Sequence, residues 1–87
     1  MTTPEQALDA ARWYVAEERG YYCHVVGLLE DDSDYFVVLE LNDPRLDWPL
    51  GPGPIFVSKA TGELWSDAYG NVLDKIDGMR PVRLGHV

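Results

Sequence analysis

Cys23 and His24 are the residues whose types could supply a nucleophile and its general base. They are adjacent in the segment 21–29, which is rich in aromatic and β-branched residues and therefore predicts a strand. Because neighbouring residues of a strand point to opposite faces of the sheet, these two side chains cannot easily form a catalytic dyad. We predict that Cys23 is a small core residue and that His24 lies on the outer face of the sheet.

Other patterns that could bind a metal or a phosphate are incomplete. Two histidines and one cysteine lack the ligand spacing of a zinc site. The run Asp31-Asp32-Ser33-Asp34 offers oxygen ligands but lacks the spacing, the glycine and the closing glutamate of an EF-hand loop. Prolines interrupt Gly51-x-Gly53, and no lysine follows it as it would in a phosphate-binding loop. The sequence therefore predicts no catalytic, metal-binding or cofactor-binding residue, and no enzyme.

The net charge of −8 is placed unevenly along the chain. Residues 30–47 hold seven acidic residues against Arg45, so they carry −6 of the total. An acidic field repels the phosphates of nucleic acid and attracts basic partners. An alternative interpretation is that acidic turns only keep a small protein soluble. The candidate partner-binding residues are Asp31, Asp32, Asp34, Asp43, Asp47 and Trp48.

The three tryptophans receive different interpretations. Trp48 stands in a proline-rich stretch, 42–53, where it is either an anchor for a partner or a lid folded over the sheet. Trp13 and Trp65 are predicted to be packing residues.

Length and composition predict one domain over residues 1–87. There is no apolar run near ~20 residues, so we expect no membrane span. The start of the chain has neither the basic residues nor the apolar stretch of a signal peptide. One cysteine excludes an internal disulfide and fits a reducing cytoplasm.

The elements predicted from local patterns are a helix followed by a small sheet. Thr3 and Gln6 form a capping-box pattern with a proline between them, and apolar residues at helical spacing follow, which predicts a helix over about 4–18. Tyr35, Val37 and Leu39 alternate with less apolar residues, so we assign them to the core beneath this helix. Gly62 is predicted to adopt a left-handed conformation in a tight turn. The predicted strands are 21–29, 35–41, 55–59, 63–66 and a short final strand in 80–84.

The C-terminal part is predicted to contain a short helix. Asn71 would cap it, its apolar positions are Val72, Leu73 and Ile76, and Gly78 would close it. The resulting fold class is α+β, with the N-terminal helix packed on a 4–5 stranded antiparallel sheet.

A motif in the middle of the chain resembles that of the bacterial YrhB / Immunity protein 35 family. The motif is Gly-x-Gly-Pro-[Ile/Leu]-x-Val-x-Lys-x-Thr-Gly-Glu, and it runs here from Gly51 to Glu63. The order of a helix, a hairpin and then the motif is similar as well. The resemblance implies a small α+β domain in the cytoplasm that binds and neutralises a bacterial toxin. It implies no particular binding residues, because the shared motif forms the fold.

The sequence leaves several functions open beside an immunity-type toxin inhibitor. One alternative is a small chaperone-like or regulatory protein-binding module, which partly apolar outer-face residues such as Phe36 and Val38 would favour. A second alternative is an accessory domain of an enzyme. Self-association through an edge strand, either 55–59 or 63–66, would give a homodimer. The leading hypotheses all expect a protein partner, with no cofactor, no nucleic acid and no membrane.

Overall fold

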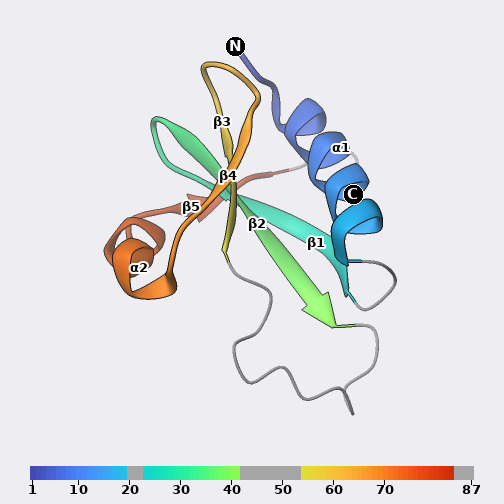
Figure 1. Ribbon diagram of the computed structural model, residues 1–87. Helices are drawn as coiled ribbons and strands as arrows, with labels where there is room; N and C mark the ends of the chain where they lie inside the picture. The colour runs from blue at the N-terminus through green and yellow to red at the C-terminus, as the bar shows by residue number, and fades with distance from the viewer. Residues whose placement is uncertain (20–22, 42–53, 84–87) are drawn as a thin grey trace.

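The structure is a computed structural model that describes residues 1–19, 23–41 and 54–83. It confirms the α+β class: a five-stranded antiparallel sheet in the order β4-β3-β2-β1-β5, with one helix on each side of it (Figure 1). In chain order the elements are α1 (Pro4–Tyr14), the π-helical turn η1 (Val15–Arg19), β1 (Cys23–Glu30), β2 (Asp34–Leu41), β3 (Ile55–Ser58), β4 (Leu64–Ser66), α2 (Tyr69–Asp77) and β5 (Arg80–Pro81).

The start of α1 has the predicted capping box. The Thr3 hydroxyl accepts a hydrogen bond from the Gln6 backbone N–H at 3.2 Å, and Gln6 Oε1 accepts one from the Thr3 backbone N–H at 2.9 Å. Two amide groups that a helix start leaves unpaired are thereby satisfied. The predicted helix over 4–18 is confirmed, with the difference that its last turn, η1, is π-helical.

The hairpin of β1 and β2 forms the centre of the sheet. Its register pairs His24 with Glu40 and Leu28 with Val37, and an irregularity occurs between Val25 and Gly27. A bulge of this kind inserts one unpaired residue and shifts the alternation of the strand. The inserted residue is Val26, whose side chain is 49% exposed.

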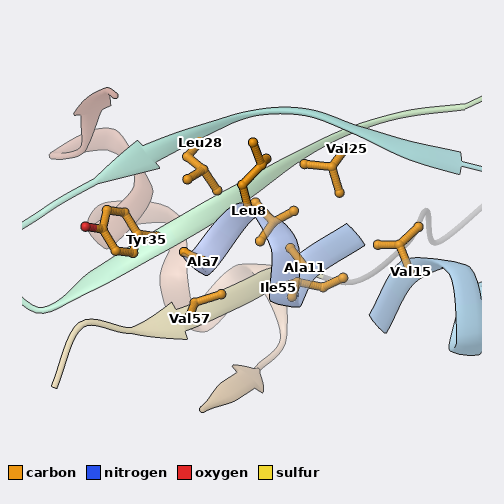
Figure 2. Close-up of a cluster of buried hydrophobic side chains, with 10 residues drawn as sticks. Ala7, Leu8, Ala11, Val15, Val25, Leu28, Tyr35, Ile55 and Val57 are labelled. Carbon is orange, nitrogen blue, oxygen red and sulfur yellow. The ribbon is translucent and has the colours of Figure 1, made fainter. Parts of the chain in front are cut away.

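The main core lies between α1 and the sheet face that it covers (Figure 2). The face predicted to be apolar is confirmed here, because Tyr35 and Val37 are buried and Leu39 packs against them. The helix contributes small and apolar side chains at helical spacing, and every strand from β1 to β3 contributes to the opposite side. The buried cluster consists of Ala7, Leu8, Ala11, Val15, Val25, Leu28, Tyr35, Val37, Ile55 and Val57.

The opposite face of the sheet carries a second, aromatic cluster. Phe56 points away from the α1 side and is fully buried, with Phe36 at 5.3 Å between ring centroids and Trp65 stacked on it at 4.3 Å. Helix α2 lies next to this cluster: it buries Val72, and the Nζ atom of its Lys75 lies 6.0 Å from the centre of the Phe56 ring. The predicted C-terminal helix therefore exists, and Gly78 closes it as predicted.

The predicted cap of α2 is wrong. The N-cap position is Ala68, which has no side chain able to cap, and Asn71 lies inside the helix. The Asn71 amide instead donates a hydrogen bond to Asp67 Oδ1 at 3.0 Å. The helix starts earlier than predicted because the chain leaves β4 at Ser66 and turns at once onto the aromatic face.

The two edges of the sheet are β4 and β5. Strand β5 pairs with β1, so the final strand joins the sheet at Arg80–Pro81. Strand β3 lies between β2 and β4, so its proposed role as an edge for dimerisation is wrong, whereas β4 is an edge. Gly62, in the turn between β3 and β4, has the predicted left-handed conformation with φ at 78°.

Candidate functional site

The acidic turn between β1 and β2 is organised by the side chain of Asp31. Its Oδ1 atom accepts hydrogen bonds from the backbone N–H groups of Ser33 at 3.0 Å and Asp34 at 2.8 Å. A short carboxylate that accepts bonds from the next backbone amides is a common way to fix a tight turn. The turn is therefore held in one shape by one of the carboxylates that were predicted to meet a partner.

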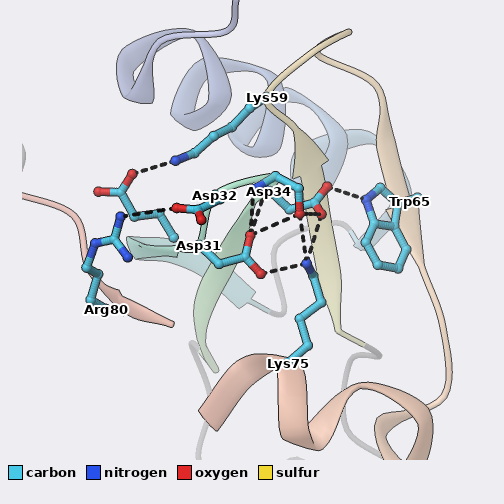
Figure 3. Close-up of polar contacts among 9 residues, drawn as sticks. Asp31, Asp32, Asp34, Lys59, Trp65, Lys75 and Arg80 are labelled. Atoms are coloured by element: carbon cyan, nitrogen blue, oxygen red, sulfur yellow. Dashed lines mark hydrogen bonds and ion pairs between the residues drawn. The ribbon is translucent and has the colours of Figure 1, made fainter. Parts of the chain in front are cut away.

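Lys75 of α2 extends its side chain toward this turn (Figure 3), and its Nζ atom lies 6.0 Å from the centre of the Phe56 ring. Its Nζ atom lies 2.6 Å from Asp31 Oδ2 and 2.9 Å from Asp34 Oδ2. The second oxygen of Asp34 accepts a hydrogen bond from the Trp65 indole N–H at 2.9 Å. One lysine and one indole thus satisfy two carboxylates, and the contact ties α2 and β4 to the β1–β2 turn.

The pKa values of the three charged groups reflect this arrangement. Burial by itself would raise the pKa of Asp31, but hydrogen bonds from Lys75 and from two backbone amides lower it to about 2. Burial would also raise the pKa of Asp34, but the hydrogen bonds from Trp65 and Lys75 outweigh this effect and lower its pKa. Burial would lower the pKa of Lys75, but its hydrogen bonds to the two carboxylates raise it. All three groups are therefore held in their charged forms.

Lys59 forms a second internal ion pair, on the side of the sheet that faces α1. Its Nζ atom lies 2.7 Å from Glu30 Oε1 and 5.0 Å from the centre of the Tyr35 ring. The Tyr35 hydroxyl donates to the backbone carbonyl of Thr2 at 3.1 Å, which fastens the start of the chain. Lys59 and Lys75 are the two lysines of the chain, so both lysines are engaged inside the protein.

The exposed charge of the described residues is predominantly acidic. Among the residues whose burial the structure describes, nine carboxylate side chains are exposed, against three exposed arginines. The two lysines are paired with Glu30, Asp31 and Asp34, so the exposed positive charge of these residues comes from arginine alone. The exposed acids are Glu5, Asp9, Glu17, Asp32, Glu40, Glu63, Asp67, Asp74 and Asp77, and the exposed bases are Arg12, Arg80 and Arg83.

The predicted partner-binding residues have different positions in the structure. Asp34 is only 8% exposed and contacts both Lys75 and Trp65. Asp31 contacts Lys75 as well. Asp32 is fully exposed, and its Oδ1 atom lies 3.9 Å from an exposed Arg80 nitrogen. That any of the three contacts a partner stays a prediction. The remaining residues, Asp43, Asp47 and Trp48, lie outside the described residues.

The two described tryptophans do not share one role. Trp65 is a packing residue as predicted, since it stacks on Phe56 and bonds to Asp34. Trp13 was predicted to pack as well, and this is wrong, because it is 70% exposed on α1. Helical spacing could have revealed this difference: Trp13 lies two positions from Ala11 and from Val15, which both face the core.

A small hollow lies beside the β4 edge of the sheet. This hollow of about 90 Å³ is lined by Tyr14, Ile55, Leu64, Trp65 and Ser66, whereas small-molecule sites typically occupy about 300–1,000 Å³. No group of three or more His, Cys, Asp or Glu side chains in the described ranges is arranged to hold a metal. In that same part of the chain, no helix has both the length and the apolar character to cross a membrane.

Compared with known proteins, the chain matches no protein-family model, no curated protein and no solved structure. The resemblance of the segment from Gly51 to Glu63 to the YrhB / Immunity protein 35 family therefore stays an expectation. Only the part of this motif from Pro54 onward lies within the described residues, where it forms β3 and the following turn.

Proposed function

We propose that this protein is a non-enzymatic, immunity-type inhibitor that acts in the cytoplasm by binding a basic protein, such as a toxin domain. The observation that carries the proposal is the acidic exposed surface, with nine carboxylates against three arginines among the residues of described burial. Such a surface attracts a positively charged partner and speeds its encounter. The resemblance of the central motif to the immunity family supports the same conclusion.

The ion pairs of the two lysines leave arginine as the source of exposed positive charge among the residues of described burial. A lysine on the surface would offset neighbouring carboxylates, but Lys59 and Lys75 are both held against internal acids. Asp31 also orders the backbone of the acidic turn, which places the exposed Asp32 between β1 and β2. A preformed surface binds at a lower entropic cost than a flexible one.

The direct test is affinity capture from a lysate of the cells that carry this gene, at low and at moderate salt, followed by mass spectrometry. We expect one stoichiometric basic protein, whose association slows as salt rises because the attraction is screened. A broad set of unrelated proteins, or no retained protein, would contradict the proposal.

The captured partner then allows a charge test by stopped-flow or surface-binding kinetics. Asp32→Lys should slow association by about tenfold at low salt, because it reverses a fully exposed charge in the most acidic segment. The matched control is Asp77→Lys, which makes the same change in net charge at the end of α2. Association that is indifferent to both variants and to salt would argue against electrostatic attraction as the basis of binding.

A small chaperone-like module is the second candidate, and one observation favours it. Several large apolar side chains are exposed on separate elements, including Val26 on β1 and Leu73 on α2. Scattered apolar contacts suit weak binding to many partners better than tight binding to one. The same capture experiment separates the two candidates by the number of proteins retained.

A further inference from the structure

Trp13 is the apolar side chain whose position the fold explains least. It is 70% exposed, and α1 makes its core contacts with the side that carries Ala7, Leu8 and Ala11. At 100° per residue, Trp13 points about 200° away from Ala11, which directs it away from the sheet. The far side of α1 is also the side turned away from the strands in Figure 1. A tryptophan there contributes little to the core and places a large apolar side chain at the surface.

The charges near Trp13 on the helix are mostly acidic. Asp9 lies one turn before Trp13, Glu5 lies one turn before Asp9, and Glu17 follows in the π-helical turn η1. Residues four apart on a helix are neighbours, so these side chains share one side of α1 with the indole. All three carboxylates are exposed, and Arg12 is the exposed base among the described residues of this helix.

We propose that this outward side of α1, centred on Trp13 and flanked by Glu5, Asp9 and Glu17, is the docking surface for a basic segment of a protein partner. The proposal rests on the proposed function, because it names the surface that a basic partner would contact. It differs from the acidic turn, since it lies on the helix and not on the β1–β2 hairpin.

The chemistry of the surface selects this occupant over others. An indole face attracts the ammonium of lysine and the guanidinium of arginine, and nearby carboxylates pair with further basic side chains. Tryptophan is also the residue type most enriched among the anchors of protein interfaces. The same carboxylates repel phosphates, which disfavours nucleic acid and anionic lipid at this face.

The test is a titration of the isotopically labelled full chain with a synthetic peptide of nine residues in which arginine and serine alternate, followed by NMR. We expect the indole N–H signal of Trp13 and the backbone signals of α1 to shift at low salt and to return as salt is added. Trp13→Ala should weaken peptide binding by about tenfold or more. Because Trp13 is exposed, this variant should keep the wild-type fold.

A matched control is Leu73→Ala, which removes an exposed apolar side chain, 53% exposed, from α2. It should leave the affinity for the peptide within about twofold of wild type. An all-serine peptide should produce no shifts at Trp13.

Two results would overturn the proposal: no binding of the arginine peptide at low salt, or shifts that concentrate elsewhere and persist in Trp13→Ala. Neither result affects the affinity-capture experiment. That experiment tests the proposed function independently of this docking surface. Conversely, the peptide could shift the Trp13 signal while affinity capture retains no basic protein. That outcome would support the docking surface and contradict the immunity role.

Discussion

At the scale of single residues, Lys75 has the largest structural role of any charged side chain described. It lies between Asp31 and Asp34, and Asp34 in turn binds Trp65. Removing one partner of a buried ion pair leaves the other charge without compensation, which costs more than the pair contributes. The acidic turn therefore depends on a residue that is more than forty positions further along the chain.

We predict that Lys75→Met lowers the free energy of unfolding by about 2 kcal/mol, somewhat less than for a fully buried pair because all three side chains are partly exposed. Urea unfolding followed by fluorescence measures this change. Arg80→Met is the control, since it removes one positive charge that lies 3.9 Å from a fully exposed Asp32. That variant should change stability by no more than about 0.5 kcal/mol. Equal losses in both variants would show that the Lys75 contacts are not specific.

The sequence identified the acidic turn but could not identify its partner. Fifteen acidic residues face seven basic ones, and nothing local selects Lys75 for Asp31. The pairing of Lys75 with Asp31 depends on the packing of α2 beside the aromatic face of the sheet, which is a tertiary contact. The exposure of Trp13 was different, because helical periodicity alone places this residue opposite the positions that face the core.

At the scale of elements, predictions succeeded where the rule is local. The Thr3–Gln6 capping box, the alternation of β2 and the left-handed Gly62 each depend on a few neighbouring residues. They failed where the context decides, as for the start of α2, which has no capping side chain, and for the π-helical end of the first helix. The bulge at Val26 was also missed, although the neighbouring Gly27 is the residue type that often marks a bulge inside a strand.

The turn between β3 and β4 gives a prediction at this scale. Gly62→Ala should lower stability by about 1 kcal/mol or more, because φ is 78° and a Cβ would lie 3.2 Å from the Thr2 hydroxyl. Gly70→Ala is the matched control, since Gly70 lies in α2 and a Cβ there would meet nothing within 4 Å. It should raise stability by up to about 1 kcal/mol. Thermal unfolding of both variants measures the two changes, and equal signs would contradict the role assigned to Gly62.

At the scale of the whole molecule, the carboxylates divide into those paired with lysine and those exposed at the surface. Both lysines form ion pairs in partly buried positions, while most other carboxylates of described burial are exposed. The internal pairs and the surface acids should therefore respond differently to acid. Protonating surface carboxylates relieves repulsion in a chain of net charge −8, whereas protonating Asp31 or Asp34 breaks an attraction.

Comparing wild type with Lys75→Met over a range of pH isolates the internal pairs, because both proteins share the same surface acids. The folded-state pKa of Asp31 is about 2, below the value of about 3.9 for an unfolded chain. Its contribution to stability is therefore fully present above about pH 5 and is lost as the pH falls through the folded-state value. The lowered pKa of Asp34 acts in the same direction.

We therefore predict that the difference in Tm between wild type and Lys75→Met is largest near neutral pH and narrows as the pH falls below about 4. In Lys75→Met, the two carboxylates lack the lysine that lowers their pKa. Lowering the pH therefore reduces the stability of the variant less than that of wild type. Calorimetry of both proteins at matched ionic strength measures this difference. If the difference in Tm stayed constant down to about pH 2.5, the carboxylates would titrate independently of Lys75, and the network in Figure 3 would not control acid stability.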